Sequence, residues 1–227
     1  MQPVAELQER RTSADDVFDY LRQQIATLEL MPGTKISEAE IAAKFGVSRQ
    51  PVRDAFSRLE NLDLLLIRPQ KATVVKWFSL KSIATARFAR LAVELEVVRR
   101  ALQLWDGSFE DAFEESLAAQ SAAVKAQNVD EFHQLDYEFH RLLCHAAKSD
   151  FAFEIISTNK ARIDRLCVLS LTSGDSMAVL VDDHEVILKQ LKLQNEPAML
   201  AGVRKHLARL DETVDAIYEE HKSYFSD

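Results

Sequence analysis

The stretch "GVSRQPVRDAFSRLE", residues 46–60, decides the fold of the first part of the chain. Its apolar residues Val52, Phe56 and Leu59 recur at helical spacing and predict a stripe that packs into a core. Ser48 stands just before this stripe and is predicted to cap the helix, and a proline is tolerated in the first helical turn. We therefore expect a helix that begins near Ser48 and buries one of its sides.

The same stretch gathers cations in an acidic chain. It carries Arg49, Arg53 and Arg58, although the formal net charge of the 227 residues is -8. Residues 44–77 hold seven basic and three acidic side chains, and the acidic excess falls in residues 78–227. Arg49 and Arg53 are four residues apart and share a helix face. A basic patch on one small domain indicates nucleic-acid binding more directly than the charge of the whole chain does.

The segments on either side of this stretch predict a winged helix. Residues 15–30 show a helical apolar stripe that a Pro-Gly pair ends, and "SEAEIAAKFG" begins with a predicted capping box between Ser37 and Glu40. Two short helices joined by a tight glycine-containing turn are typical of a helix-turn-helix. The β-type runs Leu64–Arg68 and Ala72–Lys76 then flank "PQK" and predict a hairpin.

The remainder of the chain predicts only helices. Hydrophobic residues make up 47% of the sequence, and it contains only 5 Gly and 5 Pro, a composition that favours helix over sheet. We expect a mainly α protein in which residues 1–77 form the winged helix, with a flexible arm at 1–13, and residues 78–227 form an antiparallel helical bundle. The predicted helices of the bundle are 80–105, 108–127, 129–147, 150–173, 176–194 and 196–223.

Three further features of the sequence bear on the cellular location of the protein. The two cysteines, Cys144 and Cys167, form no CxxC motif, so we expect no disulfide framework and a reducing, cytoplasmic location. The first residues contain no apolar region of a signal peptide. No window approaches the ~18 uninterrupted apolar residues of a membrane span, so no membrane partner is expected.

The basic patch predicts how DNA is recognised. In a helix-turn-helix the first residues of the second helix enter the major groove, where arginine can bond guanine or hold a phosphate. Arg58 lies two turns further on and is expected to meet a phosphate or solvent. Two such heads must meet successive grooves, which predicts a homodimer on a palindromic double-stranded operator. The predicted DNA-binding residues are Ser48, Arg49, Gln50 and Arg53 with Arg58 on the helix, and Arg68 and Lys71 on the wing.

These residues carry a family resemblance over residues ~15–77. The segment "ISEAEIAAKFGVSRQPVRDAFSRLENLDLLLIRPQ", above all its "GVSR-x-PVR" pattern, resembles the DNA-binding domain of GntR-type bacterial repressors. The resemblance implies that Arg49 and Arg53 contact the operator. The sequence departs from the family at Ala39, where many members have an arginine, and at Lys71-Ala72, where the tip of the wing lacks the usual glycine.

The bundle carries a candidate metal site. Asp136 and His140 stand four residues apart on one predicted helix, a spacing that fits a shared metal but also a surface acid beside a histidine. His184 and His206 fall on two other predicted helices, and bundles build metal sites from facing helices. Segments such as "LDYEFHRLL" and "VRKHLARL" resemble the FCD ligand-binding domain of the FadR subfamily over residues ~80–220. That resemblance implies that these four residues bind a divalent ion, Zn²⁺ or Ni²⁺, with Mn²⁺ as an alternative.

The resemblance also implies a small-molecule effector. Four protein ligands leave room on an octahedral ion, which a small carboxylate could fill. Arg90 and Arg165 are the candidates to hold that carboxylate bidentately. Either arginine could instead pair with a structural acid such as Glu94 or Asp164.

Together these features predict a one-component transcription regulator and no enzyme activity. We expect a repressor that an organic acid releases from DNA, with activation as an alternative. A different class remains open, a metal-dependent hydrolase with Glu138 or Glu185 as general base. A third is a DNA-binding dimer that responds to no effector.

Overall fold

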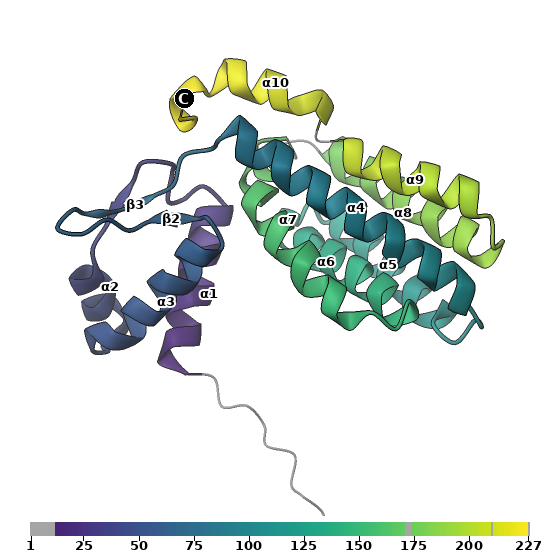
Figure 1. Cartoon of the computed structure of the whole chain (residues 1–227), viewed down its shortest axis with the longest axis horizontal. Coiled ribbons are helices and arrows are strands. Elements are labelled where there is room, and N and C mark those ends of the chain that lie inside the picture. Colours follow the sequence, from purple (N-terminus) through teal and green to yellow (C-terminus); the bar gives the residue numbers. More distant parts are fainter. Residues whose placement is uncertain (1–11, 171–173, 210, 227) are drawn as a thin grey trace, which may run out of the picture. The chain divides into compact units, whose positions relative to one another are not determined.

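The computed structural model describes residues 12–170, 174–209 and 211–226 (Figure 1). Its contacts divide the chain into two compact units, Met1–Trp77 and Phe78–Asp227. Both units are mainly helical, and the first also contains a small sheet. The predicted fold class, a winged helix-turn-helix followed by an all-α bundle, is confirmed.

The first unit combines three helices with a three-stranded antiparallel sheet. The strands lie in the order β1-β3-β2, with Lys35 opposite Val74 and Leu65 opposite Val75. The hairpin of β2 and β3 was predicted from its longer β-type runs, whereas β1 was not, because Lys35–Ile36 lies in no such run. The elements are α1 (Ser13–Ala26), β1 (Lys35–Ile36), α2 (Glu38–Phe45), α3 (Arg49–Asn61), β2 (Leu65–Leu66) and β3 (Thr73–Val75).

The core of this unit lies between α1, α3 and the sheet. The predicted stripe of α3 is buried, and it meets a matching stripe of α1 that is also fully buried. Because this packing uses one side of α3, the opposite side is left exposed for other contacts. The buried side chains of the two stripes are Val17, Leu21 and Ile25 on α1 and Val52, Phe56 and Leu59 on α3.

The start of α1 is fixed by a capping box that was not predicted from the sequence. The Thr12 hydroxyl accepts from the backbone N–H of Asp15 (3.2 Å), and the Asp15 carboxylate accepts from the backbone N–H of Thr12 (2.9 Å). The helix therefore begins earlier than predicted. The predicted flexible arm, 1–13, lies almost wholly outside the described residues.

For two predicted helix caps the position is right, but the predicted side-chain hydrogen bond is absent. Ser37 and Ser48 do stand at the N-caps of α2 and α3 with extended backbone, but neither side chain makes a capping hydrogen bond. The box between Ser37 and Glu40 therefore does not form. Ser48 and Glu40 are exposed, so water can satisfy the amides of these first turns.

Gly33 is required by the fold of the first unit. It has φ +85°, and a Cβ there would lie 2.8 Å from the Trp77 ring. We expect Gly33→Ala to lower the free energy of unfolding by about 2–4 kcal/mol, from backbone strain and overpacking together. Gly46 has φ +65° with open space around it, so Gly46→Ala should cost only about 1 kcal/mol.

Urea denaturation followed by Trp77 fluorescence in a Trp105→Phe background would measure both costs. Equal losses for Gly33→Ala and Gly46→Ala would show that the ring contact contributes nothing.

The second unit is a bundle in which α4 packs against α7 and α9, α5 packs against α6 and α8, and α8 packs against α9. Five predicted helices correspond to α4–α8, and the sixth, 196–223, is divided into α9 and α10. The predicted break at 172–176 falls partly outside the described residues. The helices are α4 (Leu80–Leu104), α5 (Glu110–Lys125), α6 (Val129–Ala146), α7 (Asp150–Ser170), α8 (Gly174–Lys192), α9 (Glu196–Ala208) and α10 (Asp211–Glu220), with a 3-10 turn η1 at Lys222–Tyr224.

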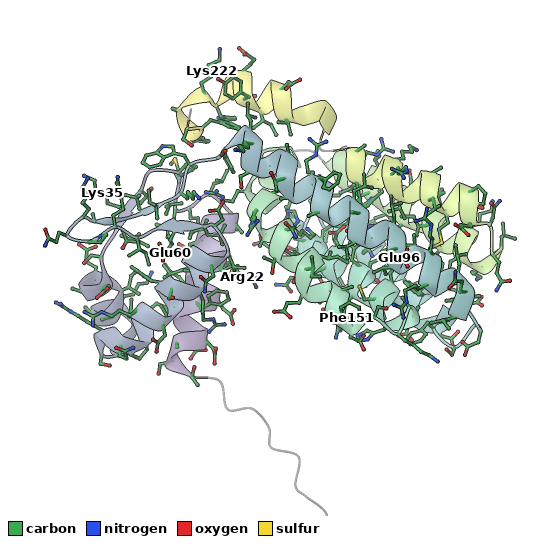
Figure 2. The ribbon with its side chains drawn as sticks, viewed as in Figure 1. Arg22, Lys35, Glu60, Glu96, Phe151 and Lys222 are labelled. Atoms are coloured by element: carbon green, nitrogen blue, oxygen red, sulfur yellow. The ribbon has the colours of Figure 1, made fainter. Side chains whose placement is uncertain are left out.

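Charged side chains such as Arg22, Lys35, Glu60 and Glu96 are exposed on the two units (Figure 2). Large apolar side chains are exposed as well, among them Phe88 (76% exposed) and Phe151 (68%). The bundle core is rich in aromatic and aliphatic residues, with Phe113 and Phe139 fully buried and in contact at 5.5 Å between ring centroids.

The end of the chain pairs with the beginning of the bundle. The backbone N–H of Phe78 donates to the carbonyl of Tyr224 (2.8 Å), and the N–H of Ser226 donates to the carbonyl of Phe78 (2.9 Å). The rings of Phe78 and Phe225 lie 5.2 Å apart. The first residue of the second unit is therefore held by its last residues.

Candidate functional site

The amino-terminal end of α3 presents hydrogen-bonding and cationic side chains to solvent. Ser48, Arg49, Gln50 and Arg53 are all exposed. Arg53 Nε lies 3.0 Å from Glu38 Oε2, an exposed pair that contributes little stability. Among the residues that the structure describes, Arg49 has no ion-pair partner. Its guanidinium therefore projects an uncompensated charge from the helix.

Arg58 is held against α1. Its Nη1 lies 2.7 Å from Asp15 Oδ1, and its guanidinium stacks 3.9 Å from the centre of the Phe18 ring. Hydrogen bonds from Thr12, and then from Arg58, lower the pKa of Asp15 to about 2, so the pair stays charged at neutral pH. Arg58 thus has a structural partner, and its contact with a phosphate stays a prediction.

The wing turns without glycine. Arg68 and Lys71 are exposed at its tip, and the backbone N–H of Lys71 donates to the carbonyl of Arg68 (3.2 Å). Gln70 between them has φ 58°, which is the position where such a turn usually carries glycine. The missing glycine is therefore accommodated by Gln70 in a left-handed conformation, and the two cations remain at the tip.

In the bundle, all four predicted metal ligands come together. Asp136 and His140 of α6, His184 of α8 and His206 of α9 are buried, and one ligand atom from each lies within 4.8 Å of the others. His184 Nε2 lies 3.3 Å from His206 Nε2 and 3.5 Å from Asp136 Oδ1. Atoms that share one ion at ~2.1 Å lie roughly 3–4 Å apart, so these donors fit a divalent metal.

An oxygen atom faces the outer nitrogen of each histidine. For His184, whose Nδ1 is hydrogen-bonded to Gln120 Oε1, this neighbour favours a protonated Nδ1 and leaves the Nε2 lone pair for a metal. The Nδ1 atoms of His140 and His206 lie near an oxygen but make no hydrogen bond within the described part of the chain. For His206 the separation exceeds a direct hydrogen bond. The pairs are His140 Nδ1 with Glu94 Oε2 (2.8 Å), His184 Nδ1 with Gln120 Oε1 (2.7 Å) and His206 Nδ1 with Asp183 Oδ2 (3.9 Å).

The electrostatics of the cluster also suit ligation. Burial lowers the pKa of His184 to about 3 and holds the pKa of His206 well below its usual value. Burial would raise the pKa of Asp136, but Lys160 and the three histidines outweigh it and leave that pKa well below its usual range. At neutral pH the site therefore offers the neutral imidazoles of His184 and His206 and the carboxylate of Asp136, the forms in which these groups bind metals.

Two buried cations border the cluster. Lys160 Nζ of α7 lies 3.1 Å from Asp136 Oδ2. Arg90 of α4 donates from Nε to Glu94 Oε1 (2.5 Å), and its Nη2 lies 3.0 Å from His140 Nε2. Arg90 thus has both the structural partner considered from the sequence and a place at the cluster.

Arg165 lies in a different environment. Its guanidinium lies 4.4 Å from the centre of the Phe78 ring, at the first residue of the second unit. The side chain of Asp164, its alternative partner, lies outside the described residues. A role for Arg165 in effector binding stays a prediction.

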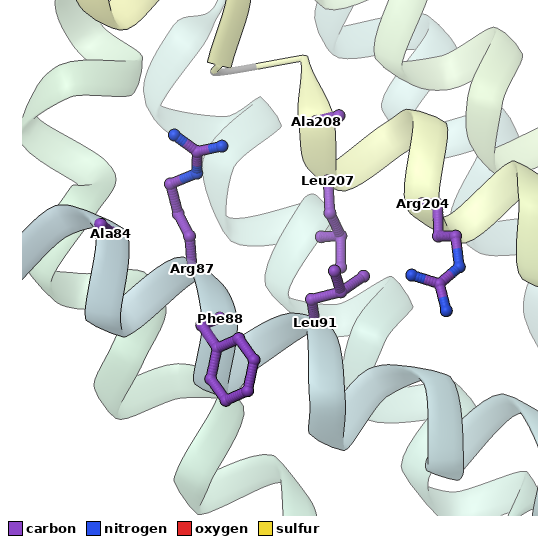
Figure 3. A pocket seen from close by; sticks show the side chains of 7 residues that line it. All are labelled: Ala84, Arg87, Phe88, Leu91, Arg204, Leu207 and Ala208. Carbon is purple, nitrogen blue, oxygen red and sulfur yellow. The ribbon is translucent and has the colours of Figure 1, made fainter.

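A pocket of about 290 Å³ opens between α4 and α9 (Figure 3). Leu91 and Leu207, which line it, are the chain neighbours of Arg90 and His206. Arg87 and Arg204 stand on opposite sides of these leucines in the view. The pocket therefore adjoins the helices that carry the cluster and presents two cations.

Comparison with known proteins identifies the two units. The model of bacterial regulatory proteins of the gntR family matches residues 13–75, and the model of the FCD domain matches residues 86–209. The chain belongs to the GntR family. It is a DNA-binding transcriptional regulator with an FCD domain.

GntR relatives match most of the chain. The HTH-type transcriptional repressor RspR of Escherichia coli K12 is 33% identical over 211 residues, which cover 93% of this chain and 92% of that protein. The gluconate operon transcriptional repressor of Bacillus subtilis is 24% identical over 203 residues, which cover 87% of this chain and 83% of that protein.

The solved structure of E. coli McbR/YncC has the same fold, with a TM-score of 0.76 at 17% identity over 93% of this chain and 100% of that one. No described helix of this GntR protein combines the length and apolar character needed to cross a membrane.

The sequence did not predict that Gln120, Lys160 and Asp183 lie against the ligands, and it predicted Glu94 only as a partner of Arg90. Glu94 follows Arg90 by one helical turn, which is a local signal, whereas Asp183 of α8 faces His206 of α9 and depends on how these two helices pack. Gln120 and Lys160 lie on helices that carry no ligand. Their roles depend on how α5 and α7 pack, which the local sequence does not reveal.

Gln120 is expected to tune the affinity for metal. Gln120→Leu removes the acceptor at His184 Nδ1, so metal affinity should fall about 10–100-fold. Gln120→Glu keeps an oxygen there and should retain metal. Competition with a chelating dye would measure both, and an unchanged affinity in the leucine variant would contradict the role of Gln120.

Proposed function

We propose that this protein is a repressor that binds a palindromic operator as a homodimer and is released by a small organic acid held at a divalent metal ion. The observation that carries the proposal is the buried cluster of one carboxylate and three histidines, on the same chain as an exposed recognition helix. A fused sensor and DNA-binding unit is what such a regulator requires. Operation in the cytoplasm follows from that role.

The DNA-binding part of the proposal rests on α3 and the wing. Arg49 and Arg53 occupy the exposed amino-terminal end of the helix that enters the major groove in this motif. Arg68 and Lys71 extend the cationic surface to the hairpin tip. The names of RspR and the gluconate operon protein, both repressors, support repression over activation.

The sensing part rests on the donor set. Asp136, His140, His184 and His206 would hold the ion, and a histidine-rich set favours Zn²⁺ or Ni²⁺. When bound, such an ion supplies a Lewis-acid centre for a carboxylate. The effector is allosteric if it prefers one arrangement of the two DNA-binding units over another.

The two acids considered as bases of a hydrolase lie elsewhere. Glu138 is held at the surface by Arg141, whose Nε donates to it at 2.8 Å, and Glu185 is exposed. Neither is part of the buried cluster. This placement favours a sensor over a hydrolase.

Selection of bound duplexes from a random pool would test the function. We expect metal-loaded protein to enrich two inverted half-sites about one helical turn apart, or a multiple of that spacing. Small organic acids should then weaken binding to the selected site. Enrichment of no common sequence, or of a single unpaired half-site, would contradict the proposal.

A further inference from the structure

The two units are joined by one peptide bond between two residues that are each held in place. Trp77 ends the first unit, and its ring lies so close to Gly33 that a Cβ there would come within 2.8 Å of it. Phe78 begins the second unit, and its backbone N–H donates to the carbonyl of Tyr224 (2.8 Å). The junction between the units therefore contains no slack residue.

Phe78 is held by the last described residues, 222–226, which we call the strap. The backbone N–H of Ser226 donates to the carbonyl of Phe78 (2.9 Å), and the Ser226 hydroxyl donates to the same oxygen (3.3 Å). The Phe225 ring lies 5.2 Å from the ring of Phe78 and 5.1 Å from that of Tyr218, between centroids. The strap thus engages the N–H, the carbonyl and the ring of Phe78.

The bundle fixes both the strap and the other side of Phe78. The strap continues from α10, which packs against α7 and buries Val214 and Ile217. From α7, the guanidinium of Arg165 lies 4.4 Å from the centre of the Phe78 ring, a cation-π contact. Phe78 is buried by these contacts. Its position therefore depends on the far end of the chain and is not set by its own neighbours in the sequence.

The strap determines how much freedom the junction has. The next residue, Ser79, caps α4, so release of Phe78 would leave one slack residue between β3 and that cap. Its two soft backbone dihedrals would let the two units turn relative to each other. One slack residue adds up to ~3.5 Å of reach, or about 7 Å over the two chains of a dimer, which equals about two base pairs of DNA.

We propose that the strap sets the half-site spacing that the dimer accepts on DNA, with Phe225 and Ser226 as its positioning residues. The inference rests on the proposed function, because it requires two DNA-binding units on one palindromic operator. A closed strap limits the arrangements that the two units of each chain can take, and therefore the separations of the recognition helices in the dimer. A dimer with slack junctions accepts a wider range of operator spacings.

Operator duplexes with altered spacing test the inference. Two base pairs inserted between the half-sites should lower the affinity of wild-type protein at least about 100-fold, since only one half-site can then be engaged. In Phe225→Ala the same insertion should cost at most about 10-fold, because the slack junctions span it. Ser226→Pro removes the N–H that bonds Phe78 and should behave like Phe225→Ala. Fluorescence anisotropy at fixed salt would measure each affinity.

Two further variants are matched controls. Phe225→Tyr keeps the ring and should retain the spacing preference of the wild type. Lys222→Ala changes an exposed strap residue whose Nζ pairs with Glu219 at 2.7 Å, and it should also retain that preference (Figure 2). Affinity for a duplex with a single half-site should be the same in all variants, because the strap is not part of the recognition helix.

Hydrogen exchange at the Phe78 amide reports on the strap without DNA. This N–H should exchange about 10- to 100-fold faster in Phe225→Ala, because two ring contacts no longer hold the strap closed. Amides in the middle of α4 should exchange as in the wild type, which separates local opening from global unfolding.

Three results would overturn the inference. They are an equal spacing penalty in wild-type protein and both strap variants, no spacing penalty in the wild type, and unchanged exchange of Phe78 in both variants. If Phe225→Ala does not fold, Ser226→Pro decides, because Ser226 is exposed and its side chain is not part of the core. The proposed function fails in a different way, when wild-type protein selects no paired half-sites at all.

Discussion

Arg49→Ala is expected to lower the affinity for the selected operator about 30- to 10⁴-fold. The guanidinium of Arg49 is exposed at the start of α3. A bidentate contact with guanine contributes about 1–3 kcal/mol of discrimination, and a homodimer makes it twice. Binding to unrelated DNA should fall much less, because it depends on the sum of phosphate contacts.

Fluorescence anisotropy with operator and scrambled duplexes at fixed salt would measure the change. Arg49→Lys is the matched control, because it keeps the charge but loses the planar fork, so it should lose specificity and retain non-specific binding. Arg22→Ala removes an exposed arginine of α1 and should affect neither duplex strongly (Figure 2). Unchanged operator affinity in Arg49→Ala would show that α3 is not the recognition helix.

His184→Ala is expected to reduce metal affinity about 100- to 1,000-fold. A complete set of four ligands contributes about 10–16 kcal/mol in structural zinc sites, so one ligand accounts for about 3 kcal/mol. His184 is fully buried, its Nε2 faces two other ligands, and its ring stacks on Phe139 at 4.0 Å. Truncation should therefore also leave a cavity that costs about 2–4 kcal/mol of stability.

The two consequences can be separated by measuring Tm with and without metal. Wild-type protein should gain stability on loading, whereas His184→Ala should show a lower Tm and little gain. His145→Ala is the control, because His145 is a partly exposed histidine paired with Asp150. One metal ion per chain in dialysed His184→Ala would show that His184 is not a ligand.

Local sequence rules predicted most of the winged helix. The stripe of Val52, Phe56 and Leu59 is periodic and buried as expected, because helical packing repeats along the chain. The rules did less well at helix ends. Thr12 caps α1 where no cap was expected, and Ser48 stands at a cap position without using its hydroxyl. A cap depends on one rotamer and on competing water, which periodicity does not encode.

The ligands of the candidate metal site were predictable, and the residues around them were less so. Asp136 and His140 are neighbours on one helix, and the family pattern supplied the other two ligands. Gln120 and Lys160 gave no sequence signal, because each reaches the cluster only through the packing of a separate helix. The pairing of Arg90 with Glu94 was one of two alternatives and is present in the structure, whereas contact of Arg90 with an effector stays a prediction.

The backbone of Phe78, where the second unit begins, pairs with residues 224–226. The first and the last described residues of the bundle therefore lie side by side. A domain with neighbouring ends can be fused to different partner domains without moving its helices. It can also be circularly permuted, with its ends joined by a short linker and new ends placed in another loop. A circular permutant that links the end of the chain to Phe78 and opens in the turn between α8 and α9 should keep its ligands in place. The same proximity of the two ends would allow whole sensing units to be exchanged between regulators.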